Sequence, residues 1–394
     1  MDIKLAQRVG LVKPSPTLSV SAKAAALRAE GRDILSLAAG EPDFDTPDNV
    51  KAAARRAIDE GQTKYTAVDG LPALKQAVID KFRRENDLEY QNNEILVSCG
   101  AKHSIYNLMQ ALLNPGDEVI IPAPYWVSYP DMARLAGAEP VIIKTGLEQG
   151  FRITPEQLRG AISDRTRLLI LNSPSNPTGA CYSREELAAL GEVLEETPDL
   201  LIASDDIYEH ILWNGEGFVN IVNARPSLKE RTIVINGVSK AYAMTGWRIG
   251  YAAGPARLIG AMKTIQSQST SNPTSIAQYA AIEALNGDQS MIPEQCAVFR
   301  QRHDFVREQM NRIEGVTCPA SDGTFYSFPN MQGVIDRMEG IGNDIELAEY
   351  LLEQAEVAMV PGSAFGAPGY MRLSFATSME VLEQAMERLH KALV

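Results

Sequence analysis

LLILNSPSNPTGACYSREELAALGEVLEETPDLLIASDD, residues 168–206, contains the pattern that decides the fold. The apolar run Leu168–Leu171 predicts a buried strand, and Leu200–Ala203 predicts a second one. Between these strands, Ser183 and Glu186 have the spacing of a capping box, which predicts the start of a helix. Two strands without polar alternation, joined through a helix, are typical of parallel strands that are covered on both faces.

The same unit repeats on both sides of this stretch, with further short apolar runs at 94–98, 118–121, 141–143 and 233–235. After about Ser275 a long helical stretch precedes three strand-like runs, so the pattern becomes α+β. We therefore predict an α/β fold, with a large domain whose mostly parallel sheet lies between helices, plus a smaller α+β domain. The expected bounds are 1–45 for an N-terminal arm with part of the small domain, 46–290 for the large domain and 291–394 for the C-terminal small domain.

Composition narrows the functional classes. The 394 residues are 45% hydrophobic, which is enough for two domains. The net charge of −13 disfavours a nucleic-acid partner or an anionic membrane surface. Residues 1–10 include charged side chains and no long apolar run, so we expect no signal peptide. No apolar run in the chain nears the roughly 20 residues of a membrane helix, so we expect no membrane span.

The metal-binding residue types are few and scattered. None of the 4 cysteines forms a C-x-x-C pair, and the 4 histidines lie far apart in the sequence. We therefore expect no metal site, and a reduced chain in the cytoplasm.

Polar segments follow several predicted strands, where function gathers in open parallel sheets. Ser98–Lys102 turns from strand to helix, which suits either a phosphate or a plain connection. Asn176 lies in a loop fixed by two prolines, as a site residue or as part of a rigid turn. Asp205 is either a site carboxylate or a helix cap. Lys240, near Arg248, is either a surface lysine or part of a buried cationic pocket.

Several common motifs are absent from the chain. Neither G-x-G-x-x-G nor G-x-x-x-x-G-K-[ST] occurs, so a nucleotide-linked α/β enzyme lacks its glycine signature. The G-x-S-x-G and H-E-x-x-H patterns are absent as well.

The polar segments, in this order, resemble the fold-type I pyridoxal-phosphate (PLP) enzymes, specifically the class I aminotransferases of the aspartate aminotransferase family. The blocks that carry the resemblance are Asn176-Pro177-Thr178-Gly179, Asp205-x-x-Tyr208, and Ser239-Lys240 with Arg248 eight positions later. The resemblance covers almost the whole chain, from Ser15 to the last helix. It implies a PLP cofactor, small amino and keto acids as substrates, and a homodimer with shared active sites.

The resemblance also implies the catalytic roles. Lys240 would carry the cofactor covalently and later move a proton from the substrate Cα. Asp205 would pair with the protonated pyridine nitrogen, so that the ring can accept electrons. Tyr208 and Asn176 would hydrogen-bond the ring oxygen O3′. The other implied cofactor contacts are the phosphate group Gly100, Ala101, Lys102 and Arg248, the stacking residue Trp126, Ser239 beside Lys240, and Tyr65 from the partner subunit.

Substrate recognition departs from the best-known pattern of the family. Arg372 would bind the α-carboxylate with two parallel hydrogen bonds. Residues 266–274 lack the arginine that animal and enteric members use for the second carboxylate. The chain instead resembles a bacterial and plant branch, in which a lysine, here Lys102, recognises that carboxylate. The implied substrate contacts are therefore Gly40, Trp126, Asn176, Arg372, Lys102, Ser15 and Thr17.

The resemblance thus predicts transfer of an amino group between aspartate and 2-oxoglutarate, giving oxaloacetate and glutamate in amino acid biosynthesis. Some members of the branch also transaminate prephenate, so a prephenate or aromatic amino acid aminotransferase is the alternative. A PLP-dependent lyase and a non-catalytic PLP-binding module share the same cofactor site and remain further alternatives.

Overall fold

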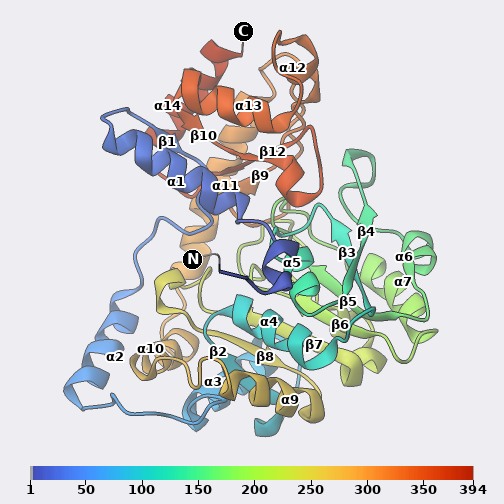
Figure 1. Ribbon diagram of the computed structural model, residues 1–394. Coiled ribbons are helices and arrows are strands. Elements are labelled where there is room, and N and C mark those ends of the chain that lie inside the picture. The colour runs from blue at the N-terminus through green and yellow to red at the C-terminus, as the bar shows by residue number, and fades with distance from the viewer. Residues whose placement is uncertain (1–2, 394) are drawn as a thin grey trace.

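The computed structural model describes residues 3–393, so Met1, Asp2 and Val394, at the outer ends of the predicted arm and small domain, lie outside it. Its largest element is a seven-stranded sheet in the order β2-β8-β7-β6-β5-β3-β4, seen in the lower part of Figure 1. Within this sheet β8 runs in the direction opposite to the other strands, which are parallel to one another. This arrangement confirms the mostly parallel α/β fold. The strands are β2 Ile95–Ser98, β3 Glu118–Ala123, β4 Glu139–Lys144, β5 Thr166–Asn172, β6 Leu201–Asp205, β7 Thr232–Gly237 and β8 Gly250–Ala253.

Both faces of the sheet are buried, as the absence of polar alternation predicts. Within β5, Leu168 and Ile170 belong to one hydrophobic cluster, whereas Leu169 and Leu171 belong to another. Successive side chains of a strand point to opposite faces, so each strand contributes to both cores. Helices α2, α3, α7 and α10 cover one face, and α4, α5 and α9 cover the other.

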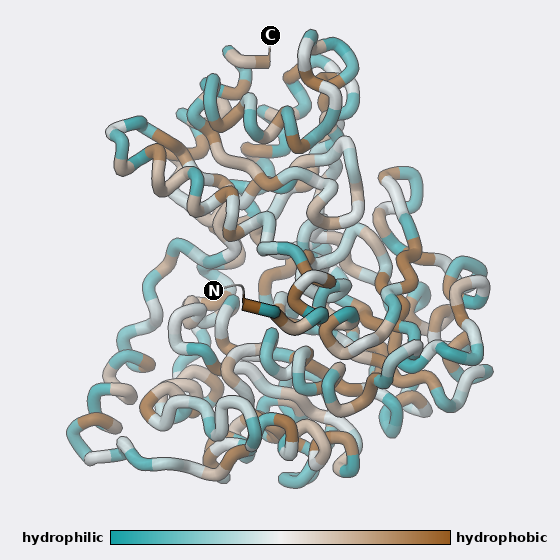
Figure 2. The backbone as a smooth tube through the Cα atoms, in the orientation of Figure 1, coloured by the Kyte–Doolittle hydropathy of each residue, from teal (hydrophilic) through white to brown (hydrophobic). Residues whose placement is uncertain are grey.

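The helices around the sheet are α2 Asp48–Asp59, α3 Pro72–Asn86, α4 Ala101–Leu112, α5 Tyr129–Leu135, α6 Pro155–Ala161, α7 Arg184–Glu195, α8 Ile221–Ala224, α9 Ala256–Ser267 and α10 Ser275–Asn286. The capping box before α7 is confirmed. The Ser183 hydroxyl accepts from the Glu186 N–H at 3.1 Å, and the Glu186 carboxylate accepts from the Ser183 N–H at 2.8 Å. Figure 2 shows apolar and polar residues alternating along α2, whose buried side includes Val50, Ala53 and Ala57.

The C-terminal elements form a second layered unit in the upper part of Figure 1. They comprise α11 Met291–Met310, β9 Tyr326–Ser327, α12 Gln332–Arg337, α13 Asp344–Tyr350 with a π-helical turn Leu351–Ala355, β10 Val357–Ala358, β11 Val360–Pro361, β12 Met371–Ser374 and α14 Met379–Ala392. Near the N-terminus, α1 Pro16–Ala29 and β1 Leu35–Ser36 join this unit, because β1 pairs with β10. Since α1 also packs through Ala24 against Leu352, we propose the domain division at residues 45 and 290.

One local prediction is wrong. The prolines at positions 14 and 16 predict an extended segment over residues 13–17 and a helix only from Ala22, but α1 begins at Pro16. Proline fits the first helical position, because the N–H that it lacks has no intrahelical partner there. Of the two readings of Asp205, the helix cap is excluded, because residues 207–210 form a turn and no helix after β6. Within residues 3–393, no helix combines the length and the apolar character needed to span a bilayer.

Candidate functional site

A cavity of about 570 Å³ lies at the carboxyl ends of the parallel strands, where the arm and the C-terminal unit meet the sheet. It brings together most of the residues that the sequence singled out. Those that line it are Ser15, Thr17, Gly40, Ala101, Lys102, Trp126, Asn176, Asp205, Tyr208, Ser239, Lys240, Arg248 and Arg372.

Lys240 follows β7 and extends into this cavity. Its Nζ donates a hydrogen bond to the Gly40 carbonyl oxygen and lies 5.7 Å from the centre of the Tyr208 ring. Burial lowers the pKa of Lys240 to about 8, with the nearby charge of Arg372 acting in the same direction. A lysine amine whose pKa is lowered in this way can act as a nucleophile near neutral pH.

Asp205, the last residue of β6, has one occupied and one free carboxylate oxygen. Its Oδ2 accepts a 2.5 Å hydrogen bond from the Tyr129 hydroxyl, whereas its Oδ1 is buried and has no partner among residues 3–393. Burial raises the pKa of Asp205 to about 6, and the Tyr129 hydrogen bond opposes that rise. A buried acceptor without a donor is costly, so Oδ1 is suited to a ligand that brings an N–H group.

Arg372, on β12, is a buried cation without an acidic partner among the described residues. It donates to Asn176 Oδ1 at 3.0 Å and to the Ala38 carbonyl at 2.8 Å, while its Nε finds no acceptor in the part of the chain that the structure describes. Its guanidinium carbon lies 4.4 Å from the centre of the Tyr326 ring. Burial lowers the pKa of Arg372, because the site offers the cation no compensating charge. A carboxylate ligand would supply that charge.

Arg248 meets the N-terminus of α4 at Gly100. The Gly100 backbone has φ +87°, and a Cβ atom there would lie 2.4 Å from Arg248 Nη2. Glycine is therefore required for this close approach. A guanidinium beside the free N–H groups of a helix N-terminus makes an anion-binding site. Gly100 itself lies under Arg248 and does not line the cavity.

Lys102 is exposed at the cavity mouth, with its Nζ 4.8 Å from the centre of the Trp126 ring. Partial burial lowers its pKa, and the charge of Arg248 adds to that effect. Tyr65 does not line the cavity of its own chain, and it is 93% exposed.

The sequence did not reveal every group in the site. Tyr129 binds Asp205, and the Tyr326 hydroxyl lies 3.0 Å from the Tyr208 hydroxyl. Both tyrosines belong to elements whose local sequence carries no motif, so they are found only through tertiary contacts. Together the cavity offers an amine, an acceptor for an N–H group, an anion-binding turn and a carboxylate-binding arginine.

Comparisons with known proteins agree with this chemistry. The sequence pattern of the family described as aminotransferase class I and II matches residues 32–389. The aspartate/prephenate aminotransferase of Nitrosomonas europaea is 59% identical over 392 residues, covering 98% of this chain and 99% of the relative. The crystal structure of the aspartate aminotransferase from Rhizobium meliloti has a TM-score of 0.96 at 48% identity, covering 100% of this chain and 99% of that one. The Thermus thermophilus aspartate aminotransferase with maleate has a TM-score of 0.94 at 45% identity, with 100% of both chains covered.

Proposed function

Because the chain belongs to the aminotransferase class I and II family, we propose that it transfers an amino group between aspartate and 2-oxoglutarate with PLP as cofactor. The membership confirms the family resemblance read from the sequence blocks. The observation that carries the proposal is a pair of buried polar atoms, Asp205 Oδ1 and Arg372 Nε, that have no partner among the described residues. Both residues line one cavity with Lys240.

The residues of the cavity fit PLP. The free Oδ1 of Asp205 suits a protonated pyridine nitrogen, and the turn at Gly100 with Arg248 suits a phosphate. When bound, PLP supplies an electron-accepting ring that stabilises negative charge at the substrate Cα. Further cofactor contacts would come from Ala101, Lys102, Trp126, Asn176, Tyr208 and Ser239.

The chain's own groups divide the remaining work. Lys240 would hold the cofactor, leave it when the substrate amine takes its place, and then accept at Nζ the proton from the substrate Cα. Asp205 would stay ionised to hold the ring proton, since a cationic partner favours its charged form. Tyr208 and Asn176 would hydrogen-bond the ring oxygen and orient the ring.

Two cationic groups support a dicarboxylic substrate. Arg372 would bind the α-carboxylate, close to the Gly40 backbone, and Lys102 would bind the distal carboxylate with Ser15 and Thr17. Trp126 and Asn176 would complete the substrate contacts. The Thermus enzyme was solved with maleate, which is itself a dicarboxylate.

We also propose a homodimer in the cytoplasm. Tyr65 is 93% exposed and does not line the cavity of its own chain, so we infer that it reaches the phosphate in the partner subunit. All four cysteines are free thiols, which agrees with a reducing compartment.

A second acceptor, prephenate, is favoured by one observation. The Nitrosomonas relative, at 59% identity, is named for both aspartate and prephenate. Prephenate is a larger dicarboxylic keto acid, so it would address the same two cationic groups.

The test is the absorbance spectrum of the protein loaded with PLP, recorded before and after aspartate is added. We expect a visible band that disappears as oxaloacetate forms, and neither band nor product in Lys240→Ala. A band that ignores aspartate would contradict the substrate, and the absence of PLP uptake would contradict the cofactor. Replacing 2-oxoglutarate with prephenate in the second half-reaction tests the second acceptor.

A further inference from the structure

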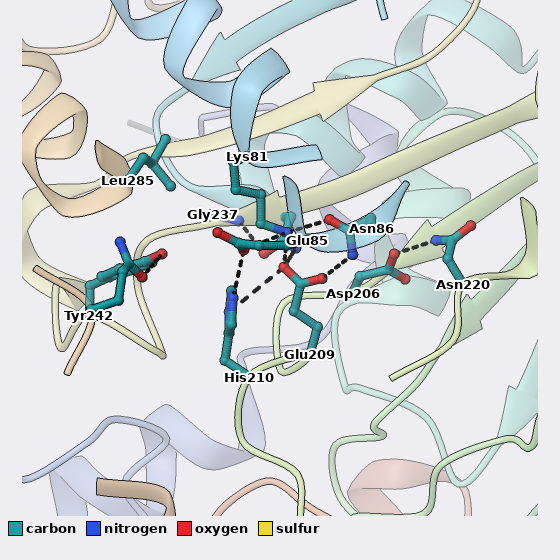
Figure 3. Close-up of polar contacts among 12 residues, drawn as sticks. Lys81, Glu85, Asn86, Asp206, Glu209, His210, Asn220, Gly237, Tyr242 and Leu285 are labelled. Atoms are coloured by element: carbon teal, nitrogen blue, oxygen red, sulfur yellow. Dashed lines mark hydrogen bonds and ion pairs between the residues drawn. The ribbon is translucent and has the colours of Figure 1, made fainter. Parts of the chain in front are cut away.

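A buried charged cluster lies behind the cavity, on the side of α3. We call it the Lys81 cluster, and its members are Lys81, Glu85, Asn86, Glu209, His210 and Asn236. Figure 3 shows the side chains of Lys81, Asn86 and Glu209 pointing toward one another. Lys81 is 0% exposed and Glu209 is 6% exposed, so both charges lie inside the protein. No step of the proposed reaction uses them.

Glu209 is the centre of this cluster. Its Oε1 accepts from Lys81 Nζ and, at 2.7 Å, from Asn236 Nδ2, while its Oε2 accepts from Asn86 Nδ2 at 2.6 Å. Lys81 also donates to Asn86 Oδ1 at 2.7 Å. Burial acts to raise the pKa of Glu209, but the Lys81 charge and these hydrogen bonds hold it below its ordinary value. The carboxylate is therefore ionised and fully paired.

The cluster contains residues of the types that bind metal ions, but it already holds the positive charge of Lys81. Glu85, Glu209 and His210 offer ligand atoms within 4.8 Å of one another. The ammonium group of Lys81 already contacts Glu209 and lies 3.6 Å from Glu85 Oε2. Lysine thus supplies the positive charge from within the chain, and a divalent ion there would repel it.

The cluster joins two segments that carry the proposed catalytic groups. Glu209 directly follows Tyr208 in the turn after β6, and Asn236 lies near the end of β7, shortly before Lys240. Asn236 Oδ1 accepts from the Gly237 N–H at 2.7 Å, which fixes the amide that donates to Glu209. The backbone also links the two segments, through the hydrogen bond from the Asp206 N–H to the Ile235 carbonyl at 2.9 Å. Side chains add the contact of Lys240 with the Tyr208 ring and the edge-on contact of the His210 and Tyr242 rings.

We propose that Glu209, neutralised by Lys81, is a positioning residue that holds the turn of Asp205 and Tyr208 in register with the segment of Lys240. This inference rests on the proposed function of those three residues. Its physical basis is geometric, since a displacement of about 1 Å between reacting groups can cost roughly 100-fold in rate. The carboxylate of Glu209 accepts from all three donors at once, and Lys81 supplies the opposite charge that a buried carboxylate needs.

Two variants test the proposal. Glu209→Gln keeps the shape but removes the negative charge nearest to Lys81, which keeps Asn86 Oδ1 and the more distant Glu85 as partners. Asn236→Ala removes the link from β7 and the acceptor of the Gly237 N–H, and Glu209 stays paired with Lys81 and Asn86. We expect both to lower kcat about tenfold with the KM for aspartate changed by less than about twofold, because the groups proposed to bind substrate are untouched. Asn236→Ala decides the matter if Glu209→Gln fails to fold.

Readouts besides turnover separate positioning from simple stabilisation. The pH midpoint of the visible absorption of the bound cofactor should shift in both variants, since it reports the groups around Lys240. In the cofactor-free protein, backbone amides of residues 206–211 should exchange hydrogen faster in Asn236→Ala than in wild type.

Glu118→Gln is the matched control. Glu118 is also 6% exposed, accepts from the Ser163 hydroxyl at 2.6 Å and pairs with Arg165. It is the first residue of β3, at the amino end of the strand, whereas the cavity lies at the carboxyl ends. We expect it to lower the unfolding temperature while kcat and the pH midpoint stay at wild-type values. If Glu209→Gln and Asn236→Ala behave like this control, Glu209 only stabilises the fold. If wild type itself takes up no PLP on Lys240, as judged by mass after borohydride reduction, the proposed function is wrong and the positioning role falls with it.

Discussion

The two ends of the cavity hold their cationic groups in different ways. Arg372 is 2% exposed, is hydrogen-bonded to Asn176 and Ala38, and lies against the Tyr326 ring. Lys102 is exposed, and the Trp126 ring is its main contact among the described residues. We call the Arg372 side the firm end and the Lys102 side the loose end. The firm end would face the α-carboxylate, which every amino acid has, and the loose end would face the variable group. The difference suggests that the chain fixes the shared part of its substrates and adapts to the rest.

The largest effect is expected at the firm end. Arg372→Ala should lower kcat/KM about 1000-fold, or roughly 4 kcal/mol, because it removes one partner of a buried charge pair in the substrate complex. The loss should be similar for aspartate and for alanine, since both carry the α-carboxylate. Steady-state kinetics with the two donors measure it, and a loss confined to aspartate would assign Arg372 to the distal carboxylate instead.

A smaller and more selective effect is expected at the loose end. Lys102→Ala should lower kcat/KM for aspartate about 10- to 30-fold, because a partly exposed charge contributes less than a buried one. Alanine lacks a distal carboxylate and should lose less than about threefold. Equal losses for the two donors would make Lys102 a phosphate contact only.

Sequence reasoning located the site through the strand ends. Asp205 and Lys240 follow buried apolar runs, and parallel strands bring their carboxyl ends to one edge of the sheet. The capping box at Ser183 was also readable, because it is a contact between near neighbours. Such local or periodic signals determine the large unit and most of the cavity.

The parts that could not be predicted depend on distant contacts. Tyr129 reaches Asp205 from 76 positions away, and nothing around Tyr129 marks it as a site residue. The Glu209–Asn236 link of the Lys81 cluster likewise joins two strand ends that the sequence shows only as separate segments. The prolines near the N-terminus predict an extended segment, but α1 begins at Pro16, because proline is tolerated in the first turn of a helix.

The pH dependence of cofactor uptake sharpens the comparison of the two ends. With the pKa of Lys240 lowered to about 8, roughly 10% of its amines are neutral at pH 7, against about 0.04% for an ordinary lysine. Only the neutral amine attacks, so the rate of PLP uptake by the cofactor-free protein should rise with pH and level off above about 8.

The charge at the firm end contributes to this pKa, so Arg372→Ala should move the uptake profile to higher pH. Lys102 is not among the groups that shift Lys240, and Lys102→Ala should leave the midpoint unchanged. Stopped-flow absorbance across pH 6–10 in wild type and the two variants gives the three midpoints. A shift in Lys102→Ala and none in Arg372→Ala would reverse the electrostatic order of the two ends.

The smallest effect is expected from Thr17 in the arm, which lines the same cavity as Lys102. Thr17 lines the cavity from the first turn of α1, and its hydroxyl makes no hydrogen bond within residues 3–393. Thr17→Val keeps the branched shape and removes only that hydroxyl. We expect kcat/KM for aspartate to fall about two- to threefold, because water can reach this half-buried position and replace the lost hydroxyl. The value for alanine and the unfolding temperature should not change. A larger loss shared by both donors would mean that the arm orders the whole cavity and that the two ends are not independent.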